Sequence, residues 1–184
     1  NSDNKKNKLN LIISKSGNTL ETIANSNILI NKSKKNVFIT ENKKSYLSDL
    51  AQKLKFEVIH HNNFIGGRFS VLSEVGMLPA QLMGLNEKKF RRFNSLVQNK
   101  KFVKSLIQNV SNTLYLTKKK KFNSIILNYD DASSDLFYWY QQLIAESLGK
   151  KSKGILPVIS NMPKDNHSLM QLYLSGFKNN FYTF

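Results

Sequence analysis

The sequence predicts an α/β fold in which a parallel β-sheet has helices on both faces. Short, nearly continuous apolar runs recur along the 184 residues, and most are followed by a polar turn and a segment with helical spacing of apolar residues. Continuous apolar runs are typical of strands buried on both faces, and their alternation with helices favours parallel pairing through crossover connections. With 40% hydrophobic residues, the chain is long enough to bury a sizeable core.

The first part of the chain contains three predicted strands and two predicted helices. The expected elements are a strand at Leu9–Ile13, a helix over residues 20–28, a strand at Asn36–Thr40, a helix at Tyr46–Leu54 and a strand at Phe56–His60. In parallel sheets of this kind, ligands bind beyond the carboxyl ends of the strands. We therefore look for functional side chains directly after each strand.

The second part begins with a long helical stretch and then returns to alternation. Residues 77–121 show helical spacing, and the apolar positions from Phe90 to Leu114 are predicted to be core. A strand at Phe122–Tyr129, a helix over residues 135–148 and a strand at Ile155–Ile159 follow.

The turn after the first strand has the layout of a phosphate site. Ser14-Lys-Ser-Gly-Asn-Thr-Leu-Glu-Thr22 contains four hydroxyl side chains around Gly17 and leads directly into a helix. Backbone N–H groups at a helix start, together with hydroxyls, bind anions well. The Gly-Lys-Ser order of a Walker loop is absent. A Ser/Thr-rich helix cap explains the same residues, and the spacing alone leaves both interpretations open.

After the third strand, a pair of glycines precedes an arginine. Gly66 and Gly67 permit close backbone approach, and Arg68 is thereby held near the strand ends, where it could stabilise a bound oxyanion. A structural Gly-Gly turn with a solvated arginine is an equal alternative. His60 and His61 have no third metal ligand at a suitable spacing, so we interpret them as the end of a strand.

One acid in the helix over residues 135–148 is a candidate base. Gln142 and Glu146 are four residues apart and so lie on one helix face, which also has apolar neighbours. We expect Glu146 to be partly buried near the helix C-terminus, where desolvation and the helix dipole would raise its pKa. Such a carboxylate suits proton abstraction near neutral pH. The alternative is a surface Glu in a last helical turn.

His167 follows a loop and begins an apolar helix, so it lies at the mouth of an element. A single histidine in such a place is catalytic in some proteins and structural in more, and position alone leaves both interpretations open.

The composition indicates which binding partners and which cellular compartment to expect. The formal net charge is +16, but the lysines occur in short runs between apolar segments, which fits solvated loops better than one nucleic-acid stripe. The chain has no cysteine and no apolar run of membrane-spanning length, so we expect a reducing, cytoplasmic location and no membrane or nucleic-acid partner. The first residue is not Met, and we expect the chain to be a piece of a longer protein.

Taken together, the motifs resemble one family. Ser14 to Thr22, Gly66-Gly-Arg-Phe-Ser70, Gln141-Gln142 with Glu146-Ser-Leu-Gly-Lys150, and His167-Ser168 with Gln171 occur in order. The set is similar to the glucose-6-phosphate isomerases (phosphoglucose isomerases), which contain sugar-isomerase (SIS) domains. The resemblance implies an SIS-type (flavodoxin-like) α/β/α sandwich, with a SIS domain and helical extension in residues 1–122 and a second SIS-like segment in residues 123–184.

The resemblance also implies roles for particular residues. Ser14, Ser16 and Thr19, with the backbone around Lys15, would hold the sugar phosphate. Glu146 would move a proton between C1 and C2 of glucose 6-phosphate and fructose 6-phosphate through a cis-enediol, and Gln142 would position the substrate. Arg68, with the Gly67 backbone, would stabilise the enediolate oxygen. His167 would assist ring opening in the partner subunit of a homodimer. The family's reaction, a step of glycolysis and gluconeogenesis, needs no metal or organic cofactor.

The sequence departs from the family pattern in several places. Asn18 stands where Thr is more usual, and Ser175 stands where an acid is common. The family's upstream Gly-rich loop and downstream lysine are not in this sequence, so we expect this segment to be inactive or nearly so by itself. Two alternatives to the isomerase are a non-catalytic sugar-phosphate-binding SIS module, which needs only Ser14 to Thr22, and a basic nucleic-acid-binding protein.

Overall fold

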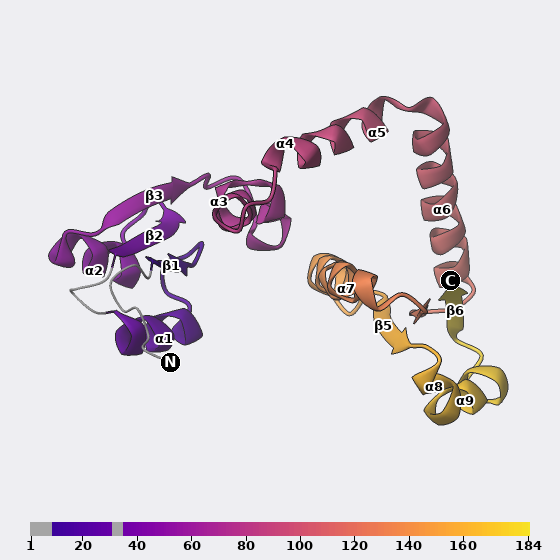
Figure 1. The fold of residues 1–184 in the computed structure, drawn as a ribbon. Coiled ribbons are helices and arrows are strands. Elements are labelled where there is room, and N and C mark those ends of the chain that lie inside the picture. The colour runs from indigo at the N-terminus through magenta and orange to yellow at the C-terminus, as the bar shows by residue number, and fades with distance from the viewer. Residues whose placement is uncertain (1–8, 31–34) are drawn as a thin grey trace. The chain divides into compact units, whose positions relative to one another are not determined.

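The computed structural model describes residues 9–30 and 35–184, which form two compact units (Figure 1). Unit 1 ends at Arg91 and unit 2 begins at Arg92, and each unit has its own three-stranded parallel sheet. Residues 92–122 belong to the second compact unit. The boundary predicted from the sequence lay after residue 122. The assignment of SIS-type domains to 1–122 and 123–184 stays a prediction.

Unit 1 is built on the sheet β1–β2–β3, in which neighbouring strands follow chain order. Its strands and connecting helices are β1 (Leu9–Ile13), α1 (Leu20–Leu29), β2 (Lys35–Glu41), α2 (Tyr46–Leu54) and β3 (Glu57–His61). In the register, Ile13 pairs with Ile39, and Glu41 pairs with His61. The residues after the three strands therefore meet at one edge of the sheet, as the sequence predicts.

Both connecting helices of unit 1 contribute to one core cluster. Phe38 of the central strand packs with Leu47 and Ala51 of α2, and these three side chains are fully buried. Ile23 of α1 packs against the same cluster. The two right-handed crossovers step in the same direction along the sheet, which brings both helices to one face. Ser45 begins α2 with a capping box, in which its side chain accepts the N–H of Ser48.

Helices occupy the chain from the end of β3 to the next strand. They are the 3₁₀ helix η2 (Gly67–Leu72), α3 (Glu74–Leu82), α4 (Glu87–Phe90), the 3₁₀ turn η3 (Arg91–Phe93), α5 (Asn94–Gln98) and α6 (Lys100–Lys118). The helical character of this stretch confirms the prediction, but its assignment to the core is wrong. No residue of α6 is buried, and Ile107 and Leu114 are 61% and 58% exposed. The apolar stripe exists, but the described residues leave most of it uncovered.

Unit 2 contains a sheet of strand order β5–β4–β6. Its elements after α6 are β4 (Asn123–Asn128), the 3₁₀ turn η4 (Asp131–Ser133), α7 (Ser134–Leu148), β5 (Leu156–Asn161), α8 (Lys164–Ser168), α9 (Met170–Ser175) and β6 (Asn180–Thr183). All pairings are parallel. Because β5 and β6 lie on opposite sides of β4, their crossovers place helices on opposite faces.

Alternate residues of β4 face the two helical layers of unit 2. Ile125 and Leu127 form a buried cluster against which Met170 and Tyr173 of α9 pack, whereas Ile126 lines a cavity beside α7. The predicted parallel α/β fold is thereby confirmed. Among residues 9–30 and 35–184, none of the helices combines the length and apolar character that crossing a membrane requires.

Candidate functional site

The predicted phosphate turn lies at the carboxyl edge of the unit 1 sheet. Ser14 directly follows β1 and is buried, and its Oγ lies 2.9 Å from the Thr19 Oγ1. Ser16 Oγ accepts the backbone N–H of Asn18 at 3.2 Å. The side chains of Ser16 and Thr19 are exposed. The three hydroxyls that the sequence analysis selected therefore lie in one short turn before α1.

Gly17 fixes the backbone of this turn. Its φ is +65°, and a Cβ there would lie 2.1 Å from Ser45 Oγ and 2.9 Å from Thr40 Oγ1. Only glycine fits this conformation and this space without displacement. The Gly17 carbonyl accepts the N–H of Leu47 at 3.0 Å, which anchors the turn to the start of α2.

The backbone of the turn is held through one carbonyl oxygen. The Lys15 carbonyl accepts from both the Glu41 N–H and the Thr40 hydroxyl, at 3.0 and 3.1 Å. In contrast, the N–H groups of Lys15, Ser16 and Thr19 donate to no acceptor within the part of the chain that the structure describes. Unpaired N–H groups beside a helix start are suited to binding an anion.

A buried carboxylate holds the lysine of this turn. Glu41, the last residue of β2, pairs with Lys15 Nζ at 3.0 Å and with Lys43 Nζ at 2.9 Å. Hydrogen bonds from Lys43 and then Lys15 lower the pKa of Glu41 below its usual value. Lys15 Nζ also donates to the Asn63 carbonyl at 3.3 Å. Lys15 thus connects the phosphate turn with the segment that leads to Gly67 and Arg68.

Gly67 and Arg68 begin the 3₁₀ helix η2 in the same unit. The Arg68 guanidinium lies 4.8 Å from the centre of the Phe69 ring. Ser70 is buried, and its hydroxyl donates to the Gly67 carbonyl at 2.6 Å. This hydrogen bond holds the Gly67 backbone at the start of the short helix, next to Arg68.

The buried His61 pairs with the partly exposed Glu74, a contact that the sequence did not predict. The His61 Nδ1 contacts the Glu74 Oε1, and its Nε2 lies 3.0 Å from the Ile65 carbonyl oxygen. Burial acts to raise the pKa of Glu74, but hydrogen bonds from its own backbone N–H and from His61 outweigh that effect and lower it. The interpretation of His61 as a simple strand end was therefore incomplete.

Glu41 and Glu74 predict a loss of stability in acid. Their pKa values are lower in the folded chain, so the unfolded chain binds protons first as the pH falls. Their contribution is complete above the unfolded pKa of about 4.3 and is lost as the pH falls through the folded values. We expect Glu41→Gln with Glu74→Gln to flatten the fall of unfolding free energy below about pH 5. Urea denaturation between pH 7 and pH 3 measures this, and an unchanged slope in the double variant would contradict it.

Gln142 and Glu146 lie on α7 in unit 2. The Gln142 Nε2 donates to the Glu146 Oε2 at 3.4 Å, which confirms that the two side chains are stacked on one face. Both side chains are exposed, so the expected partial burial of Glu146 is wrong for this chain. Apolar residues of α7 such as Trp139 and Leu143 line the cavity beside β4, whereas Glu146 does not line it.

His167 lies in α8, which is attached to the carboxyl end of β5. The N–H of Asn161 donates to Asp165 Oδ2 at 2.8 Å, and this fixes the start of α8. The side chain of His167 is exposed. Because α7 connects two parallel strands, it runs antiparallel to them, and Glu146 in its last turn lies toward the amino end of β5. Glu146 and His167 therefore lie toward opposite ends of a strand about 15–20 Å long.

The site residues predicted from sequence thus form two groups. Unit 1 brings together Ser14, Lys15, Ser16 and Thr19, and the contact of Lys15 with Asn63 connects them to the segment before Gly67 and Arg68. Unit 2 contains Gln142, Glu146 and His167 and separates His167 from the other two.

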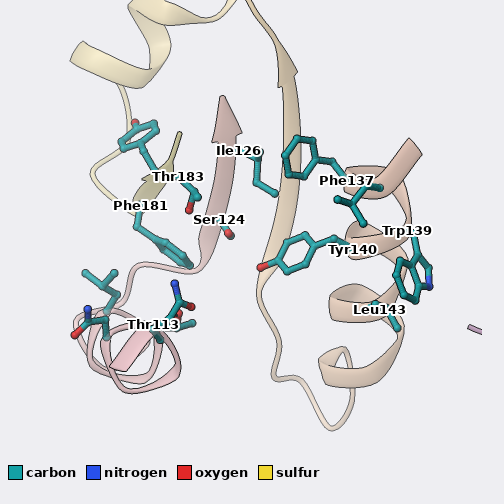
Figure 2. Close-up of a pocket in the computed structure, with 14 residues that line it drawn as sticks. Thr113, Ser124, Ile126, Phe137, Trp139, Tyr140, Leu143, Phe181 and Thr183 are labelled. Carbon is teal, nitrogen blue, oxygen red and sulfur yellow. Dashed lines mark hydrogen bonds between the residues drawn. The ribbon is translucent and has the colours of Figure 1, made fainter. Parts of the chain in front are cut away.

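Unit 2 also contains a cavity of about 560 Å³ that none of these site residues lines (Figure 2). It lies between α6, α7 and the strands β4 and β6, with Phe137 and Tyr140 pointing from α7 toward the strands (Figure 2). Its lining is mainly aromatic and aliphatic and includes no carboxylate, histidine or basic side chain. It offers no group for proton transfer at neutral pH, and so it is not the candidate site.

Three functional candidates were missed at the sequence level, namely Glu41, His61 and Glu74. Each lies at the carboxyl edge of the unit 1 sheet or at the first turn of the helix beside it. A usable signal was present for two of them, because a charged or titratable residue that ends a buried strand has to find a partner.

Comparisons with known proteins support the resemblance. No protein-family model matches the chain. The chain is 39% identical to glucose-6-phosphate isomerase of Methanocaldococcus jannaschii over 186 residues, which covers 94% of this chain and 46% of that protein. It is 35% identical to glucose-6-phosphate isomerase of Campylobacter jejuni over 95% of this chain and 46% of that protein.

A solved structure has the same fold over nearly the whole chain. The crystal structure of a hypothetical protein from Thermus thermophilus matches 95% of this chain and 46% of its own, with a TM-score of 0.77 and 27% identity. The chain thus spans about half the length of the curated relatives that it matches. The resemblance to glucose-6-phosphate isomerases is confirmed as homology over that half.

Proposed function

From this homology, we propose that the full-length protein containing this chain interconverts glucose 6-phosphate and fructose 6-phosphate. The observation that supports this most strongly is the 39% identity to a glucose-6-phosphate isomerase along 94% of the chain. The proposal assigns the phosphate group to the turn after β1. There, the hydroxyls of Ser14, Ser16 and Thr19 and the N–H groups around Lys15 would act as donors.

In the proposed reaction, the Glu146 carboxylate removes the C2 proton of the open-chain aldose. The C–H electron pair forms the C1–C2 double bond of a cis-enediol, and the negative charge moves to the former carbonyl oxygen. Arg68 and the Gly67 backbone stabilise that oxygen. The enediolate oxygen at C1 takes up the proton that the C2 hydroxyl gives up, and return of the carbon-bound proton from Glu146 to C1 gives the ketose, so no redox partner is consumed. Gln142, stacked on Glu146 at 3.4 Å, positions the substrate.

His167 is proposed to assist ring opening in the site of a second subunit. Support comes from the topology of unit 2, in which Glu146 and His167 lie toward opposite ends of β5. Two groups on opposite ends of one sheet cannot both contact a sugar phosphate bound at either end. A twofold dimer would allow His167 of each copy to complete the site of the other.

A mixed-dimer experiment tests the function and the sharing of sites together. One copy has Glu146→Gln, the other has His167→Ala, and two affinity tags allow the mixed full-length dimer to be purified. In that dimer one site combines both intact residues, so we expect about half the wild-type isomerase activity, while each parental variant dimer is inactive. If the mixed dimer is as inactive as its parents, the two residues act within one copy.

A non-catalytic sugar-phosphate-binding module is the second candidate. All the proposed phosphate donors lie in unit 1, and none of them depends on Glu146 or His167, which lie in unit 2. This arrangement favours a module that only binds. Such a module binds fructose 6-phosphate without turning it over. A coupled assay on the full-length protein, run beside a binding measurement, distinguishes the two functions.

A further inference from the structure

The His61 ring is a deeply buried titratable group for which the proposed reaction has no use. Its side chain is 1% exposed, although the neighbouring His60 on the same strand is exposed. A buried imidazole must have its hydrogen bonds satisfied within the protein. His61 meets this requirement through two contacts, the Glu74 carboxylate at Nδ1 and the Ile65 carbonyl at Nε2.

Both partners of the ring are hydrogen-bond acceptors. The Ile65 carbonyl can only accept, so the ring donates to it through Nε2, while Nδ1 contacts the Glu74 carboxylate. Both nitrogens of the ring are therefore held by neighbouring groups.

The two contacts enclose the segment that contains Gly67 and Arg68. Ile65 immediately precedes Gly66, and Glu74 is the first residue of α3, directly after η2. Inside the segment the hydrogen bonds are local, such as Phe69 N–H to the Gly66 carbonyl and Ser73 N–H to the Ser70 carbonyl, both at 2.9 Å. One buried ring on β3 therefore fastens both ends of the turn to the sheet.

We propose that this arrangement, the His61 clamp (the ring of His61 with Glu74 and the Ile65 carbonyl), positions the Arg68 guanidinium for the reaction. His61 and Glu74 are positioning residues, because they reach the substrate only through Arg68. This inference rests on the proposed function for its catalytic consequence, whereas the clamp itself is a property of unit 1. Just before this segment, the Asn63 carbonyl accepts from Lys15 Nζ at 3.3 Å, so the chain that enters the clamp also contacts the phosphate turn.

Steady-state kinetics of the full-length protein test the catalytic consequence. We expect His61→Gln to lower kcat about 10–100-fold with little change in KM, because Arg68 stabilises charge that develops only in the transition state. Glu74→Gln, which keeps the side-chain shape, should act in the same direction. His60→Gln is the matched control on the same strand and should leave kcat unchanged.

A double-mutant cycle separates positioning from general damage. If His61 acts through Arg68, then His61→Gln should have almost no further effect on kcat in an Arg68→Ala background. A loss of kcat that is equally large with and without Arg68 would overturn the positioning role.

Hydrogen exchange tests the clamp even if the protein has no isomerase activity. In His61→Gln and Glu74→Gln, the amides of Phe69 and Ser73 should lose protection by at least about tenfold, while amides of β2 keep theirs. Unchanged protection at Phe69 and Ser73 in both variants would overturn the clamp. An inactive wild-type protein would instead remove the proposed function, and the clamp would then be decided by exchange alone.

Discussion

Replacing Glu146 by Gln should lower isomerase turnover of the full-length protein by about 10²–10⁴-fold, because general acid–base catalysis typically contributes that much. The amide keeps the shape of the carboxylate but cannot take the C2 proton. Affinity for fructose 6-phosphate should change little, because the proposed phosphate donors lie on the turn after β1 in unit 1. A coupled assay gives the turnover, and isothermal titration gives the affinity.

The matched control for this variant is Asp135→Asn. Asp135 is also an exposed carboxylate on α7, but it lies in the first turn rather than the last. The Asp135→Asn substitution removes one negative charge from the same helix and leaves the contact between Gln142 and Glu146 unchanged. Activity close to wild type in Asp135→Asn, beside an inactive Glu146→Gln, assigns the effect to the base. If Glu146→Gln turns over like wild type, the carboxylate is not the base, and the non-catalytic module becomes the better explanation.

The strands could be predicted well because buried parallel strands have a simple sequence signature. The strand at Leu9–Ile13 has the predicted bounds, and β2 extends the predicted Asn36–Thr40 by one residue at each end. The position of Ser14 at the carboxyl edge follows from the same pattern, since parallel strands end together. The position of the proposed phosphate turn could therefore be predicted from the sequence, whereas the positive φ of Gly17 was found only in the structure.

Side-chain partners and burial could not be read from the same pattern. The helical period of α6 shows that one face is apolar but not whether this chain covers it, and Ile107 is exposed. Likewise, apolar neighbours near Glu146 predicted its burial, but those neighbours turn toward the cavity beside β4. The pairing of His61 with Glu74 joins residues 13 apart through a turn whose path no periodicity describes.

Gly17→Ala should destabilise unit 1. An L-residue at φ +65° costs about 1–2 kcal/mol. The new Cβ would also displace Ser45, whose side chain caps α2, and losing that cap costs about 1 kcal/mol. We expect the free energy of unfolding to fall by about 2–3 kcal/mol, as measured by urea denaturation.

Gly84→Ala separates backbone strain from the clash. Gly84 has a φ of +81°, but a Cβ there would meet nothing within 4 Å, so this variant should show the strain alone. A loss of stability equal to that of Gly17→Ala would show that contact with Ser45 and Thr40 contributes nothing.

The same substitution at Gly17 should weaken sugar-phosphate binding in the full-length protein. Thr40 Oγ1 lies 2.9 Å from the position that the new Cβ would occupy, and the same hydroxyl holds the Lys15 carbonyl at 3.1 Å. Moving Thr40 would let the Lys15 peptide rotate and turn its N–H, and that of Ser16, away from the anion. Charged hydrogen bonds contribute about 1.5–3 kcal/mol each, so the loss of one should weaken fructose 6-phosphate binding about 10–100-fold. Gly84→Ala should bind like wild type, and tight binding by Gly17→Ala would show that the phosphate is held elsewhere.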